Sequence, residues 1–75
     1  MQALVEYIAK ALVEHPDQVS VQTHEIDGGE EIVLSVAEDD RGRVIGKNGR
    51  TAHAMRTLLA TASTDGKLVN LEIEG

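Results

Sequence analysis

The sequence predicts an α+β domain of two layers, in which helices cover one face of a three-stranded mixed sheet. Apolar residues recur at helical spacing at the start of the chain. Strict alternation of apolar and polar residues follows in two central segments and returns in the last one. Helical spacing also marks the region before the last segment, where two glycines interrupt it. The predicted order is therefore helix, strand, strand, helix, helix, strand.

The first half of the chain predicts a helix and a β-hairpin. Helical spacing over residues 2–14 predicts a helix that ends before Pro16. Residues 18–26 and 31–37 alternate, so each is expected to be a half-buried strand. The turn sequence DGGE between them has two glycines that accept positive φ, which favours an antiparallel hairpin.

The second half predicts two helices and a strand. Asp39 or Asp40 is expected to cap a short helix over residues 40–45. A longer helix begins near Arg50, with Ala52 on its inward stripe, and the sequence STDG breaks it. Alternation over residues 67–74 predicts the last strand.

The length of 75 residues makes residues 1–75 a single domain. Such a domain buries only about 60% of the surface of its unfolded chain, so a dimer would add useful stability. The chain has no Cys, which excludes disulfides and thiolate metal sites and fits a reducing cytoplasm. No apolar run reaches the ~18 residues of a membrane span. The N-terminus does not resemble a signal peptide, because Glu6 interrupts its apolar stretch.

Positive charge is concentrated in residues 41–56. This segment holds five of the seven Lys and Arg residues and no Asp or Glu, although the chain carries a net charge of −6. An acidic protein repels phosphate as a whole, so any nucleic-acid function must be local. Local charge can dominate, because charges beyond ~8 Å are screened at physiological salt.

The sequence GKNG at the centre of this segment suits a phosphate. Two glycines three apart permit a tight turn and a close approach of ligand backbone. N–H groups at the start of the following helix favour an anion, and Lys47, Arg50 and Arg43 add charge. A Gly-x-x-Gly between helices is often only a turn. The apolar Val44 and Ile45 before it and the clustered basic residues favour a functional loop.

The stretch VIGKNGRTAHAMR resembles the K homology (KH) signature, and the element order is similar to the type II, or prokaryotic, KH arrangement. The opening LVEYIAKALVEHPDQVSV and the length resemble the small bacterial single-KH RNA-binding proteins of the KhpA family. The resemblance implies binding of single-stranded RNA, in which the loop clamps the backbone of about four nucleotides. It also implies an RNA chaperone or post-transcriptional regulator, a homodimer, and pairing with a larger KH-containing protein, KhpB.

The resemblance and the charge pattern together predict an RNA site and no catalytic residue, metal or cofactor. The predicted RNA-binding residues are Arg43, Val44, Ile45, Gly46, Lys47, Asn48, Gly49, Arg50 and His53. His53 is either an RNA contact or simply an exposed helical position. Val44 and Ile45 are expected to support an apolar base groove opposite the second strand. Many KH domains have a bulky aliphatic residue where this chain has Ala52, so a shallower groove is expected.

Other chemistry is poorly supported by the sequence. The chain has no Phe or Trp, and Tyr7 lies on the first helix, so aromatic base stacking is not expected. The three histidines are scattered over separate elements and do not predict a metal site. The stretch GRVIGKN is one residue short of a nucleotide-binding P-loop and has Asn48 where Ser or Thr is required. The alternative function is a degenerate KH fold whose acidic surface binds proteins, and an enzyme has no supporting residues.

Overall fold

The predicted order of elements is confirmed. The structure is a computed structural model that describes residues 2–62 and 66–74. Its main elements are α1 (Gln2–Leu12), β1 (Ser20–Ile26), β2 (Gly29–Ser35), α2 (Arg41–Ile45), α3 (Arg50–Ala62) and β3 (Leu68–Glu74). Short 3₁₀ turns lie at Pro16–Gln18, Glu38–Asp40 and Lys47–Gly49.

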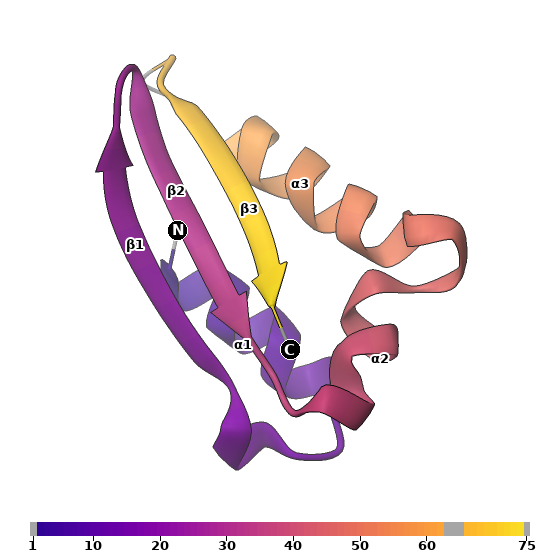
Figure 1. Ribbon diagram of the computed structural model, residues 1–75. Helices are drawn as coiled ribbons and strands as arrows, with labels where there is room; N and C mark the ends of the chain where they lie inside the picture. Colours follow the sequence, from indigo (N-terminus) through magenta and orange to yellow (C-terminus); the bar gives the residue numbers. More distant parts are fainter. Residues whose placement is uncertain (1, 63–65, 75) are drawn as a thin grey trace.

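The three strands form one mixed sheet in the order β1-β2-β3. β1 pairs antiparallel with β2, and β2 pairs parallel with β3. The helices lie on one side of this sheet and leave the other side open (Figure 1). Gly29 begins β2 opposite Leu68, and a Cβ there would lie 1.8 Å from the carbonyl oxygen of Leu68. A glycine is therefore required for β3 to approach this closely.

The core lies between the sheet and the helices. Side chains from every main element except β1 are buried there: Val5, Ala9, Ile32, Leu34, Val36, Val44, Met55, Leu59 and Leu71. Val21 of β1 packs against this cluster while only partly buried. β1 is thus the least covered strand, and β2 at the centre of the sheet carries the fully buried Ile32 and Leu34. No helix among residues 2–62 and 66–74 is long and apolar enough to cross a membrane.

The boundaries differ from the prediction by one or two residues at most element ends. α1 ends at Leu12 instead of residue 14, and the hairpin turn is shorter because β2 begins at Gly29. Most of the predicted STDG break, residues 63–65, lies outside the described residues.

The predicted capping role of Asp39 or Asp40 was wrong. Asp40 stands before α2 but makes no capping hydrogen bond to it. Its side chain is 1% exposed and accepts hydrogen bonds from the backbone N–H groups of Glu14 and His15 instead. A carboxylate buried this deeply is stabilised by these donors, which lie far away in the sequence.

Candidate nucleic-acid interface

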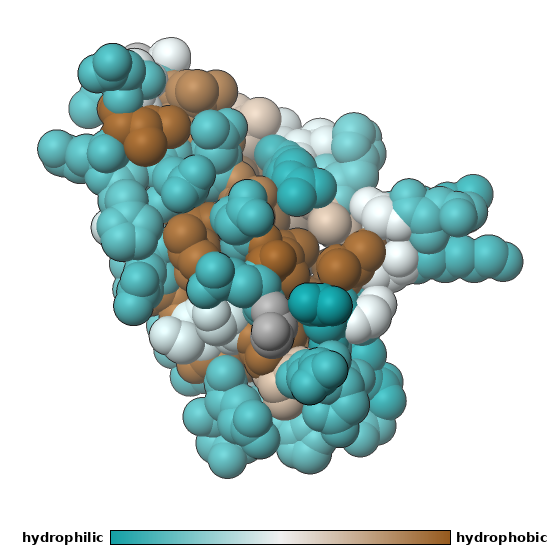
Figure 2. All heavy atoms as spheres, in the orientation of Figure 1, coloured by the Kyte–Doolittle hydropathy of each residue, from teal (hydrophilic) through white to brown (hydrophobic). Residues whose placement is uncertain are grey.

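The GKNG sequence forms a sharp connection between α2 and α3. Gly46 ends α2 with φ 78° and ψ 171°, and its N–H donates to the carbonyl of Gly42 at 2.9 Å. Asn48 adopts the left-handed conformation, with φ 58° and ψ 25°. Asn tolerates this conformation better than most residues. Hydrophilic side chains project from the molecule where this loop lies (Figures 1 and 2).

The two glycines of the loop are required for different reasons. A Cβ on Gly46 would lie 2.3 Å from Oγ1 and 2.8 Å from the backbone nitrogen of Thr51, so no side chain fits. A Cβ on Gly49 would meet nothing within 4 Å, although its φ of 74° disfavours other residues. Gly46 is therefore fixed by packing inside the protein. The open space at Gly49 leaves its backbone accessible to a ligand.

The cations at the loop are not neutralised by the protein. Lys47 and Arg50 are exposed and make no ion pair or side-chain hydrogen bond with the described part of the chain. The backbone N–H groups of Lys47 and Asn48 likewise have no hydrogen-bond partner there. Arg41, at the start of α2, is also exposed and unpaired within residues 2–62 and 66–74. The sequence prediction included Lys47, Asn48 and Arg50 but missed Arg41.

The apolar residues before the loop are only partly accessible. Val44 is 0% exposed and belongs to the core, so it supports the loop from beneath and does not face a ligand. Ile45 is half-buried at the end of α2. Ala52 is 3% exposed and packs inside the protein, so it does not form the floor of a surface groove. His53 is exposed on α3.

The strand beside the loop-bearing helices is β3, not β2. β2 is the central strand and is hydrogen-bonded on both sides, whereas β3 is an edge strand that lies next to α3 (Figure 1). Nη2 of Arg56 on α3 donates to the carbonyl of Leu71 on β3 at 3.3 Å. The expected base groove opposite the second strand stays a prediction. Sequence alone did not single out Arg56 from its neighbours.

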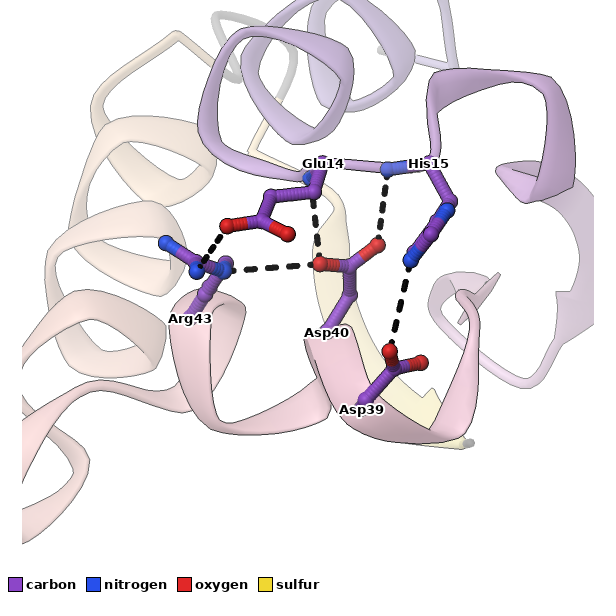
Figure 3. A network of polar contacts seen from close by, with 5 residues as sticks. All are labelled: Glu14, His15, Asp39, Asp40 and Arg43. Carbon is purple, nitrogen blue, oxygen red and sulfur yellow. Dashed lines mark hydrogen bonds and ion pairs between the residues drawn. The ribbon is translucent and has the colours of Figure 1, made fainter.

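Arg43 belongs to a second group of polar residues, here called the junction network, which joins the end of α1 to α2. Its members are Glu14, His15, Asp39, Asp40 and Arg43 (Figure 3). Asp40 accepts from the N–H groups of Glu14 at 3.0 Å and His15 at 2.9 Å. Arg43 pairs with the carboxylate of Glu14, and its Nε lies 3.5 Å from Oδ1 of Asp40. Nε2 of His15 lies 3.3 Å from Oδ2 of Asp39.

The junction network keeps the Asp40 carboxyl ionised. Burial alone would raise the pKa of Asp40, because it disfavours the charged form. The N–H donors of Glu14 and His15 oppose this effect, as do the positive charges of His15 and Arg43. The result is a pKa below the ordinary value of 3.8. The charge of Arg43 is therefore paired with carboxylates of the protein, unlike that of Lys47 four residues later.

The histidines and acidic residues of the described chain are not arranged for metal binding. His15, His24 and His53 lie on separate elements. Across residues 2–62 and 66–74, no three His, Cys, Asp or Glu side chains are placed to share a metal ion. What the site does present is an exposed loop with free cations, free N–H groups and an accessible backbone.

Comparison with known proteins identifies the family. The family model "KhpA/KhpB, KH domain" matches residues 2–73. The chain belongs to the KhpA/KhpB family of KH domains. The suspected relationship and the type II KH fold are thereby confirmed. No solved structure matches the chain.

Several relatives in this family are named "RNA-binding protein KhpA". The chain is 52% identical to that of Halalkalibacterium halodurans over 67 residues, which cover 89% of this chain and 88% of the relative. It is 51% identical to that of Caldanaerobacter subterraneus, covering 97% and 99% of the two chains. It is 46% identical to that of Listeria monocytogenes serovar 1/2a, covering 97% of each.

Proposed function

We propose that this protein binds single-stranded RNA through the GKNG loop without catalysing a reaction, and acts as an RNA chaperone or post-transcriptional regulator. One observation carries the proposal. In a chain of net charge −6, Lys47 and Arg50 have no partner among residues 2–62 and 66–74, and neither do the backbone N–H groups of Lys47 and Asn48 in the loop. The names of the KhpA relatives support the same reading.

The chemistry of the loop suits a phosphate backbone more than a particular base. Backbone N–H groups and cations both interact with phosphate oxygens, and these contacts carry no sequence information. The accessible backbone at Gly49 lets a sugar-phosphate chain approach closely. A single KH domain contacts about four nucleotides. Binding through this loop is therefore expected to be weak and to fall steeply with salt.

We extend the proposal to a homodimer, or a pair with a KhpB-like partner, in the cytoplasm. Large apolar side chains are exposed on the helical layer, and Tyr7 of α1 is 74% exposed and Leu58 of α3 is 51% exposed. Leu4 and Leu12 add to this surface on α1. Apolar surface of this kind favours protein association. Two joined domains would bind one RNA more tightly through effective concentration.

The second candidate function is a protein-interaction module, and the open face of the sheet favours it. Glu31 and Glu72 alternate with the buried Ile32 and Leu71, so they lie on the face away from the helices. Glu74 lies on the same face, where it accepts a hydrogen bond from Ser35. This acidic face suits a basic protein better than RNA. A function in binding basic proteins does not explain the unpaired cations of the loop.

The test is RNA binding by a loop variant and a matched control. Lys47→Asp with Asn48→Asp removes the cation and adds two carboxylates at the loop. Lys10→Asp with Gln18→Asp makes the same charge change at exposed positions of α1 and the Pro16–Gln18 turn. Fluorescence anisotropy with a labelled mixed-sequence RNA is measured at low and moderate salt, after circular dichroism has shown that all variants are folded. We expect the loop variant alone to lose binding. Equal loss in both variants would mean that only net charge matters and would overturn the proposal.

A further inference from the structure

We infer that Arg56 reads RNA bases, and that it favours bases that present two adjacent hydrogen-bond acceptors. The inference rests on the proposed function and adds a specificity-determining residue to it. Arg56 is the point at which α3 reaches the edge strand: its Nη2 donates to the carbonyl of Leu71 at 3.3 Å. The guanidinium thus bridges α3 and β3, beside the path that a bound strand would take from the loop.

The position of Arg56 relative to the loop fits a base contact. Arg56 follows Arg50 by six residues, which is about 9 Å along a helix axis. His53 lies three residues before it on the same flank of α3 and is exposed. Each step of three residues turns by about 60° around the helix, so the exposed side chains of Arg50, His53 and Arg56 wind around α3 from the loop to the side that faces β3. A strand whose phosphates sit at the loop would have its bases directed toward this side of α3.

The orientation of the Arg56 side chain separates it from the other cations of the segment. Lys47 and Arg50 are unpaired and free to follow a phosphate. Nη2 of Arg56 donates to the backbone carbonyl of Leu71, and the guanidinium has no carboxylate partner among residues 2–62 and 66–74. A guanidinium has five N–H donors in a rigid fork, so most of them remain available in a fixed direction.

The paired N–H donors of the Arg56 guanidinium define which bases are preferred. An arginine donates two parallel hydrogen bonds to neighbouring acceptors, as it does to O6 and N7 of guanine. Cytosine presents a similar pair in O2 and N3. Adenine and uracil have no two adjacent acceptors on their Watson–Crick and Hoogsteen edges, so they match the fork less well. Single-stranded RNA leaves these edges open to a protein. The preference expected at one nucleotide is thus guanine or cytosine over uracil or adenine.

The experiment compares two kinds of RNA and two kinds of variant. The probes are an all-uridine 8-mer and the same 8-mer with cytidine or guanosine at a central position. The variants are Arg56→Lys, which keeps the charge but loses the fork, Arg56→Gln, and Lys47→Gln as the matched phosphate-contact control. Dissociation constants are measured at several salt concentrations, with thermal unfolding of each variant alongside.

We expect the natural protein to bind a substituted 8-mer at least about fivefold more tightly than the uridine 8-mer. Arg56→Lys should bring that ratio near one while the affinity for the uridine 8-mer and the salt slope stay the same. Lys47→Gln should weaken binding of all probes equally and lower the salt slope by about 0.7.

Three results would overturn the inference. The first is that the natural protein shows no base preference. The second is that Arg56→Lys and Arg56→Gln both keep the base preference. The third is that the Arg56 variants unfold at lower temperature and lose affinity for all probes equally. The last result would mean that Arg56 only stabilises the packing of α3 against β3. Binding that depends on Lys47 but shows no base preference overturns this inference alone. Binding that does not depend on Lys47 overturns the proposed function as well.

Discussion

Arg43 and Lys47 lie four residues apart in the same basic segment, yet the structure uses their charges in opposite ways. Arg43 faces Glu14 and Asp40 in the junction network. Lys47 stands on the loop with no partner in the described chain. The five cations of residues 41–56 therefore do not form one uniform binding patch. The comparison teaches that a cluster of like charges in a sequence can combine residues that hold the fold together with residues that face a ligand.

The two regions depend on each other through α2. This helix has only five residues and is stabilised mainly by its contacts, because so short a helix is marginal alone. Asp40 ties its start to the end of α1, and Val44 anchors it in the core. The GKNG loop follows directly. The junction network thus fixes the position from which the loop projects.

The largest expected effect is on stability, from Asp40→Ala. The change leaves the N–H groups of Glu14 and His15 without their acceptor and removes a partner of Arg43. We expect the greatest fall in melting temperature of any single substitution discussed here, measured by circular dichroism. Asp39→Ala is the matched control, since Asp39 is exposed and its one polar side-chain contact with residues 2–62 and 66–74 is that with His15. Equal melting temperatures for the two variants would contradict the structural role of Asp40.

The loop and the junction network should differ in their effect on RNA binding. Lys47→Gln is expected to lower the slope of log affinity against log salt by about 0.7, as for one lost phosphate contact, and to leave the melting temperature unchanged. Arg43→Gln should lower the melting temperature slightly and leave the slope unchanged, because its charge is already paired. Isothermal titration at three salt concentrations gives both slopes. A reversed pattern would mean that Arg43 and not Lys47 meets the phosphate.

Stability should fall in acid because of Asp40. Its pKa is lower in the folded state than the ordinary value of 3.8, so the folded protein holds the ionised form more strongly than the unfolded chain does. The stabilisation is complete above pH 3.8 and is lost as the pH falls through the folded pKa. Urea unfolding between pH 6 and pH 2 measures it. The Asp40→Asn protein should show a shallower decline over this range, whereas Asp17→Asn, an exposed control, should follow the natural protein.

The smallest expected effect comes from Glu14→Gln. Glu14 and Arg43 form an exposed pair, and such pairs contribute at most about 1 kcal/mol to stability. Removing the carboxylate frees the Arg43 guanidinium toward solvent near the loop. RNA affinity should therefore rise, by no more than about fivefold, while the melting temperature changes little. No rise would show that Arg43 is too far from the bound strand to contribute.

The sequence was sufficient for the order of elements because apolar periodicity marks all of them except the five-residue α2, which was predicted from its capping candidates. It was also sufficient for the loop, since glycine spacing and local charge are visible in a few adjacent residues. It did not reveal the partners of Asp40, because Glu14 and His15 lie 26 and 25 residues away. Alternation predicts a strand but not its neighbours, so the position of β3 beside α3 could not be predicted. The roles of Val44 and Ile45 also differ, because a helix turns adjacent side chains about 100° apart.

The parallel pairing of β2 with β3 has a consequence for how the protein is made. Partners in this pairing, such as Ser35 and Glu74, are 39 residues apart, and both helices of the loop lie between them. The ribosome makes a chain from its N-terminus, and a domain generally folds as a unit. β3, which completes the sheet, is synthesised after the loop and both of its helices, and Arg56 has no edge-strand carbonyl to hold it until then. A nascent chain would therefore display its basic loop before its sheet is complete, so discrimination between bases should arise only once β3 has been made and has paired.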